Sequence, residues 1–173
     1  RPEHASRALL GERQRRRVNA AGESTVYTPQ VMIGRQVQTV WRASPAVARA
    51  LDAAGGVAEV GVAMLLERQG SESILRLGVA RSGSPAGKPA SVWLAQTIDA
   101  QETRVRAGEN AGTTLRHDRV VAKLWGPWSL DRLPLSKALD VELGQGAWGL
   151  TAFVEAADGR LLQSLRMASA DCR

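Results

Sequence analysis

The feature that most constrains the fold is a series of short β-rich runs after Gly56, separated by residues that favour turns. Several of them alternate apolar and polar side chains, as strands covered on one face do. The runs are residues 57–67, 73–81, 91–98, 102–106, 120–128, 149–156 and 161–167. The last two flank Asp158-Gly159, which is a hairpin signal. Because short strands joined by turns build sandwiches and barrels, we predict an antiparallel β-sandwich-like domain over residues 55–173.

The sequence before Gly55 has a different character. Residues 2–21 are rich in alanine, leucine, glutamate and arginine, which predicts a helix. Gly22 is placed to terminate it. Ala8, Leu9 and Val18 are its best candidates for burial.

Two predicted strands and a second helix follow this first helix. They are a strand over residues 26–33 that Pro29 interrupts, a turn at Gly34-Arg35, a strand over residues 36–41, and a helix from Ser44-Pro45 to Gly55-Gly56. Residues 1–54 therefore have the order helix–strand–strand–helix. The fold class of the whole chain is α+β, an α/β portion followed by the sandwich-like domain.

The net charge of +6 at pH 7 is concentrated near the N-terminus. Residues 1–54 hold nine arginines against four acids, and most of the excess lies in residues 13–17. We interpret this basic run as a solvated helix end whose charge complements the helix dipole. Binding of nucleic acid through the run is the alternative. It is disfavoured because no aromatic side chain lies between Arg1 and Val26, so we expect no nucleic-acid partner.

The sequence also limits membrane, metal and cofactor chemistry. It holds no apolar run of about 18 residues that would span a membrane. Cys172 is the single cysteine, so this sequence encodes no internal disulfide or zinc–cysteine cluster. Its two histidines, His4 and His117, are too few for a His-rich metal site. It contains no phosphate-binding loop and no nucleophile elbow. We therefore expect no metal and no cofactor.

Residues 108–112 form a candidate loop site. Gly108 and Gly112 bracket Glu109 and Asn110, and His117 follows as an acid–base partner for Glu109. Such a loop can grip an anion with its backbone amides. The alternative, which we favour, is a structural turn in which the glycines take positive φ and Asn110 caps its own backbone.

Tryptophan supplies most of the aromatic side chains. Trp125-Gly126-Pro127-Trp128 predicts a turn with two indoles, and Trp93 and Trp148 lie elsewhere in the β region. An aromatic platform for a sugar or peptide is one interpretation. Filling of a sandwich core and its rim is the other, and we favour it.

Two stretches of the sequence carry a family resemblance. They are residues 26–35, VYTPQVMIGR, and residues 105–117, VRAGENAGTTLRH, which continue into Val120-Val121. Together they resemble the family catalogued as domain of unknown function 1223. The resemblance implies a bacterial protein that is periplasmic or secreted, with a thioredoxin-like domain before a β-rich domain. It further implies that residues 1–54 are the C-terminal portion of that thioredoxin-like domain.

The resemblance also implies a role for Thr28-Pro29. It would be the thioredoxin-type loop, with a cis bond before Pro29, that shapes a substrate groove opposite a Cys-x-x-Cys dithiol. The cysteine-containing strand and helix that the family places earlier are not in this sequence. We therefore expect this chain to be redox-inert, with no catalytic residue of its own.

Two functions remain open. The first is thiol-redox or thiol-binding work by the intact protein; if it is an enzyme, the resemblance implies a thiol-disulfide oxidoreductase. The second is a non-catalytic β-sandwich module for binding or assembly in the bacterial envelope. The expected partner is a protein or peptide, or the missing N-terminal segment.

Overall fold

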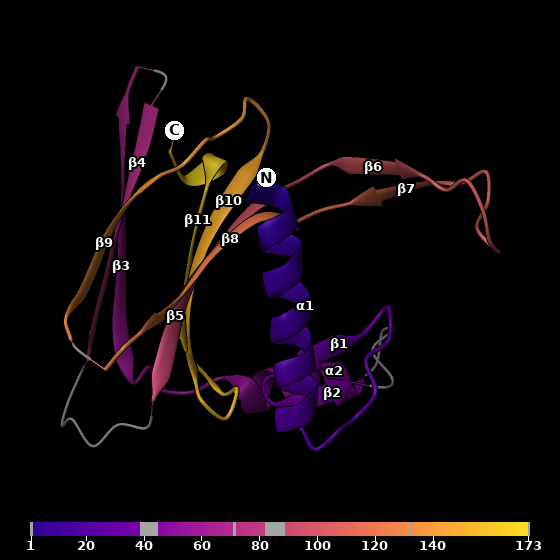
Figure 1. Ribbon diagram of the computed structural model, residues 1–173, viewed down its shortest axis with the longest axis horizontal. Coiled ribbons are helices and arrows are strands. Elements are labelled where there is room, and N and C mark those ends of the chain that lie inside the picture. The colour runs from indigo at the N-terminus through magenta and orange to yellow at the C-terminus, as the bar shows by residue number, and fades with distance from the viewer. Residues whose placement is uncertain (1, 39–44, 71, 82–88, 132, 173) are drawn as a thin grey trace.

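The computed structural model describes residues 2–38, 45–70, 72–81, 89–131 and 133–172. In that part of the chain two antiparallel sheets face each other as a β-sandwich (Figure 1). The first sheet has the order β11–β10–β5–β8, and the second has the order β3–β4–β9. Their strands are β3 (Val60–Gln69), β4 (Glu72–Arg81), β5 (Ala90–Ile98), β8 (Val120–Ser129), β9 (Leu135–Asp140), β10 (Trp148–Ala156) and β11 (Leu161–Ala168). The predicted β-rich antiparallel fold is confirmed.

The main hydrophobic core fills the space between the two sheets. Leu75 from β4, Leu94 from β5 and Leu150 from β10 are each 0% exposed and belong to one buried cluster. Within β4, core residues fall at every second position, Leu75, Leu77 and Val79, as the two-residue period of a strand requires. Burial of these side chains is the main favourable contribution to folding.

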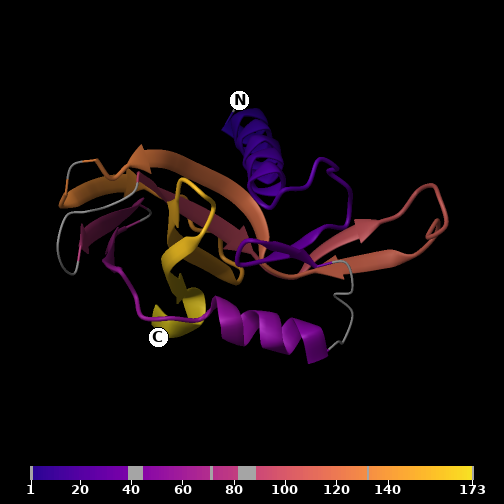
Figure 2. The same cartoon turned by 90° about the horizontal axis from the view of Figure 1, so that it is seen from below.

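The central strands β5 and β10 are covered on both faces. Their outer face packs against helix α1 (Pro2–Ala20), which crosses the four-stranded sheet (Figures 1 and 2). Trp93 and Leu124 of the sheet form a second cluster there, which Leu9, Leu10 and Phe153 complete. A sheet covered on both sides gives continuous buried runs, which explains why residues 92–97 are all buried.

Helix α1 ends where its sequence predicts. Gly22 has φ +82°, and the Glu23 and Gly22 amides donate to the carbonyls of Val18 and Asn19, at 3.1 and 3.0 Å. This is the Schellman pattern, for which glycine is the favoured residue. Val18 is buried as predicted and Leu9 is partly buried, whereas Ala8 is exposed because the helix turns that position away from the sheet.

The rest of the N-terminal region forms a small layer of its own. Strands β1 (Val31–Ile33) and β2 (Gln36–Gln38) pair around a turn at Gly34, with φ +57°, and helix α2 (Pro45–Ala54) follows. The predicted order helix–strand–strand–helix is confirmed. The predicted strand end at Trp41 and the cap at Ser44 lie outside the described residues. Figure 2 shows the β1–β2 hairpin between the two helices.

Some elements differ from the prediction. Strand β3 begins at Val60 rather than Val57, which is 96% exposed. Strands β7 (Thr114–His117) and β9 were not predicted; β7 pairs with β6 (Gln101–Arg104) in a hairpin that projects from the sandwich (Figure 1). The short 3-10 helix Ser169–Cys172 at the C-terminal end was not predicted either.

The predicted β-rich run over residues 120–128 is confirmed as strand β8, and the prediction of a turn at Trp125–Trp128 within it is wrong. This segment lies within β8, where the pairing with β5 shifts register between Val92 and Leu94. Gly126 has φ +105°, and a Cβ atom there would lie 2.7 Å from the Val92 carbonyl oxygen. The strand continues through the Gly-Pro pair because the register shift forms a β-bulge, and β-bulges accommodate glycine and proline.

Candidate functional site

The most distinctive polar cluster joins α1 to the outer face of the four-stranded sheet. Glu155 of β10 is 3% exposed, and its carboxylate accepts hydrogen bonds from Arg13 Nη2 at 2.6 Å and Nε at 3.2 Å. Arg17 Nη1 donates to the same carboxylate. We call these three residues the ion triad. A carboxylate is retained at such a buried position when several charge-assisted hydrogen bonds satisfy it.

The arginines of the triad make further contacts. Arg17 also donates to the carbonyl of Gly159, at 3.2 Å, and to that of Gly34 in the β1–β2 turn. The Arg13 guanidinium lies 4.8 Å from the centre of the Phe153 ring, within cation–π range. Arg17 therefore connects the helix, the sheet and the hairpin.

These contacts correct the interpretation of residues 13–17 as a solvated helix end. Arg15 and Arg16 are exposed, although Arg16 lies 5.6 Å from the ring centre of Trp93. Arg13 and Arg17 are partly buried, with 25% and 11% of their side chains exposed. Two of the arginines thus position the helix. No local pattern indicates this role, because their partner Glu155 is more than 130 residues away along the chain.

A groove opens beside the triad, between α1, β1 and the outer face of the sheet. Its volume is about 550 Å³, and we call it the helix groove. Its lining residues are Leu10, Arg13, Gln14, Arg17, Gln30, Met32, Gly34, Ala95, Val121, Leu124, Thr151, Phe153, Leu161 and Ser164. Gln14 Nε2 donates to Gln30 Oε1 at 2.8 Å and fixes one edge of the groove. A volume of this size suits a small organic ligand.

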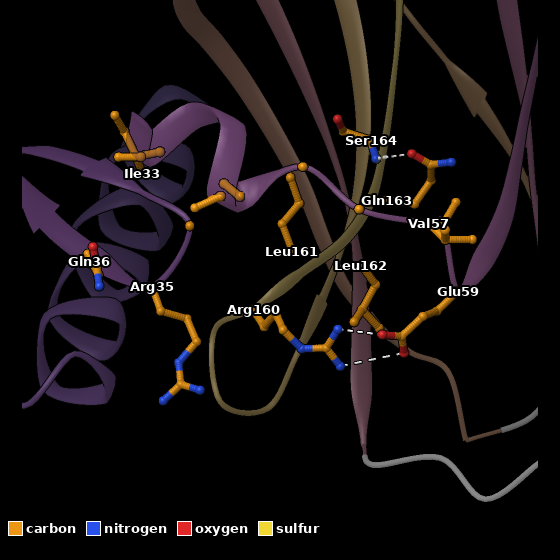
Figure 3. A pocket seen from close by; sticks show the side chains of 17 residues that line it. Ile33, Arg35, Gln36, Val57, Glu59, Arg160, Leu161, Leu162, Gln163 and Ser164 are labelled. Carbon is orange, nitrogen blue, oxygen red and sulfur yellow. Dashed lines mark hydrogen bonds and ion pairs between the residues drawn. The ribbon is translucent and has the colours of Figure 1, made fainter. Parts of the chain in front are cut away.

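A second cleft of about 520 Å³ lies between the β1–β2 turn, the end of α2 and strand β11 (Figure 3). Arg160 points to Glu59 across it and donates to its carboxylate. This contact raises the pKa of Arg160 above its ordinary value. On the opposite wall Arg35 lies 3.6 Å from Asp158. These side chains are about half exposed and charge-paired, so the cleft offers a ligand little fixed charge.

The predicted loop site at residues 108–112 forms the tip of the projecting hairpin. Gly108 and Gly112 have φ +83° and +87°, as the structural interpretation requires. The Asn110 backbone carbonyl, rather than its side chain, accepts bonds from Thr113. All of these residues are exposed, and Glu109 and His117 lie at opposite ends of the hairpin. The structure therefore does not bring the proposed acid–base pair together.

The predicted substrate-groove residues Thr28 and Pro29 are exposed, and the bond between them is cis, as the resemblance implies. They lie just before β1, next to the helix groove that Gln30 and Met32 line. Gln14 Nε2 holds the preceding segment by donating to the Tyr27 carbonyl, at 3.4 Å. The sequence did not point to the groove, because its walls come from six separate stretches of chain.

The described tryptophans pack as core and rim. Trp93 and Trp148 are buried, and Trp125 and Trp128 pack against the main core, so the favoured interpretation is confirmed for these four. The Cys172 side chain lies outside the described part. Within the described residues there is no group of three metal-ligating side chains. No helix found there is long and apolar enough to cross a membrane.

The comparisons with known proteins place these features in a family. The fold is similar to that of HBP35 of Porphyromonas gingivalis, with a TM-score of 0.62 and 12% identity. The match covers 92% of this chain but 58% of that protein, so this chain corresponds to little more than half of its neighbour's length. A comparison with curated proteins finds no match. The family model described as a protein of unknown function, DUF1223, matches residues 3–155, and the chain belongs to this family.

Proposed function

We propose that this chain is a non-catalytic binding module of the bacterial envelope. The sandwich of residues 55–173 carries the helix–strand–strand–helix portion of residues 1–54, and further polypeptide completes that portion as a thioredoxin-like layer. The observation that carries the proposal is that the β1–β2–α2 layer is only partly covered. Among the described residues, no third strand pairs with β1 or β2, and no residue of α2 is buried.

The hairpin is too small to be stable alone. Strands β1 and β2 have three residues each, and a two-stranded hairpin is marginal in water without a third strand or a packed face. The hairpin pairs Val31 with Gln38 and Ile33 with Gln36 around its two-residue turn. In that register the backbone groups of Met32 point to the open edge of β1. An added strand would find its hydrogen-bond partners there.

Helix α2 gives the second argument. It is amphipathic, yet it has no buried residue. Leu51 is 57% exposed, and Val57 just beyond the helix is 96% exposed. An amphipathic helix without a buried residue, followed by a second exposed apolar side chain, is the pattern that we expect where another segment packs. The match covers only 58% of HBP35, and this greater length of the neighbour supports further polypeptide as the occupant.

Hydrogen exchange tests the proposal by comparing this chain with the product of its whole gene. We expect the Met32 amide to exchange at least about tenfold more slowly in the whole product, because an added strand would hydrogen-bond it. Met32→Pro should abolish the added protection of α2. Val37→Pro is the matched control, since it removes the equivalent amide on the outer edge of β2. Identical exchange in the two proteins would refute the proposal.

A second candidate is thiol-redox work by the whole protein. The order of elements in residues 2–54, with Thr28-Pro29 directly before β1, supports it because this is the order that the family resemblance implies. The test is reduction of a disulfide-bonded peptide with dithiothreitol as the electron source. The whole-gene product should accelerate the reaction and this chain should not. A whole product without activity would end this candidate and leave the binding module standing.

A further inference from the structure

We infer that the helix groove binds a small amphipathic monoanion, an aliphatic carboxylate whose apolar chain lies on the sheet and whose charged end meets Arg13. The groove lies on the sandwich side of α1, and all fourteen residues that line it belong to this chain. The inference is tested on this chain alone, so its outcome is separate from that of the proposed completion of the β1–β2–α2 layer.

Charge selects the sign of the ligand. Among the fourteen residues that line the groove, Arg13 and Arg17 are cationic and none is acidic. Both arginines share the single carboxylate of Glu155, so the ion triad carries a net charge of +1. Because the triad is largely screened from water, this excess charge acts more strongly than it would on the surface. One ligand carboxylate would balance it.

The hydrogen bonds that the two arginines already make indicate where the carboxylate of the ligand would bind. Arg17 is fully engaged, since it donates to Glu155, Gly159 and Gly34. Arg13 uses Nε and Nη2 for Glu155, and its Nη1 has no hydrogen-bond partner in the described part of the chain. A guanidinium retains its preference for a carboxylate at such an unused nitrogen. Arg13 Nη1 is therefore the donor for the ligand.

The walls select the rest of the ligand. The apolar lining of the groove comes from Phe153, Leu124 and Val121 on the sheet, from Leu10 of α1 and from Met32 of β1. The Phe153 ring lies directly below the Arg13 guanidinium, so the apolar floor begins where the charge ends. Flexible aliphatic and methionine side chains adapt to a flexible chain. A volume of about 550 Å³ admits a medium-length one.

The test is calorimetric titration of this chain with decanoate, with decanol as the uncharged probe of the same length. We expect saturable one-to-one binding of decanoate, at least about tenfold tighter than that of decanol. A tenfold difference in affinity is less than the binding free energy that one charge-assisted hydrogen bond can contribute. Equal binding of the two probes, or no binding of decanoate, would overturn the inference.

Two variants locate the site. Arg13→Gln should weaken decanoate at least about tenfold and leave decanol unchanged, whereas Arg15→Gln, on the exposed side of α1, should change neither. Ser164→Trp fills the groove beside Phe153 from an exposed position and should abolish binding of both probes, whereas Ser164→Ala should not. Ser164→Trp keeps all three residues of the ion triad, so the test remains valid if Arg13→Gln loosens the helix.

Sedimentation separates the remaining alternative, in which a second copy of the chain covers the groove. We expect a chain that is monomeric at the concentrations of the titration and remains so with decanoate bound. A dimer that decanoate dissociates, or that excludes decanoate, would show that the groove is an interface and would overturn the assignment to a small ligand.

Discussion

The two faces of the four-stranded sheet are covered in different ways. The inner face meets the second sheet through closely packed aliphatic side chains, and Leu94 and Leu150 there are completely buried. The outer face meets a single helix through a smaller cluster and the ion triad around Glu155. A groove of about 550 Å³ remains open beside that helix.

This difference separates stability from function. Apolar contacts are non-directional and fill the space between the sheets, so the inner face is closed. The outer contact depends on a few directional bonds that fix the position of α1 without covering the sheet. Binding is therefore expected on the outer face and global stability on the inner one.

The largest effect should come from the inner face. Leu150→Ala removes a completely buried side chain from the central strand and leaves a cavity, which should lower the free energy of unfolding by about 3 kcal/mol. Urea unfolding followed by circular dichroism measures it. Leu65→Ala, at a position 56% exposed, is the control and should cost well under about 1 kcal/mol. Equal losses at the two positions would contradict a single dominant inner core.

The outer contact should yield a smaller and local effect. Glu155→Gln leaves two guanidinium groups without their counter-charge, which should lower the free energy of helix docking by about 2 kcal/mol. The arginines of residues 13–17 are trypsin sites, so cleavage there should rise about thirtyfold while the sandwich stays intact. The neighbouring exposed Glu12→Gln should change nothing. Collapse of the whole fold in Glu155→Gln would refute the separation of the two faces.

The smallest effect concerns an ion pair on the face of the second sheet that points away from the main core. The hydrogen bond from Arg76 of β4, 2.9 Å long, holds the pKa of Glu67 of β3 below its ordinary value. A lowered folded-state pKa contributes stability above the unfolded-state pKa, and that contribution is lost as pH falls through the folded-state value. Because Arg76 is exposed and Glu67 is about one-third exposed, water screens the pair, and we expect only a slight loss on acidification.

Nuclear magnetic resonance titration of the Glu67 carboxyl measures this shift directly. Arg76→Gln should return the pKa of Glu67 to its ordinary value. A titration curve that is the same with and without Arg76 would show that the pair does not persist in solution.

The sequence predicted the parts of the fold that local patterns determine. Alternation located most sandwich strands, and Gly22 marked the end of α1. Strand β9 was not predicted because its sequence, LSKALD, contains good helix formers. Its extended conformation depends on the pairing with β4. The Gly126-Pro127 pair indicated a turn because a bulge depends on the partner strand.

The candidate site was harder to predict than the fold. The glycine conformations of the 108–112 loop follow from local sequence, and so does the exposure of a turn. The ion triad and the helix groove come from segments far apart in the chain, and a single sequence carries no record of which distant residues meet. The sequence therefore shows that Arg13 and Glu155 are charged, but it does not predict that they form an ion pair.

Native-state hydrogen exchange of the intact chain tests the central claim most directly. The account predicts the slowest exchange in β4, β5 and β10, intermediate exchange in α1, and the fastest exchange in β1, β2 and α2. The Glu155→Gln variant should accelerate exchange in α1 and in the β1–β2 hairpin that Arg17 holds to it, but not in the sandwich strands. Uniform protection of all these elements, or equal acceleration of the sandwich strands in the variant, would contradict a self-sufficient sandwich that holds an open outer layer.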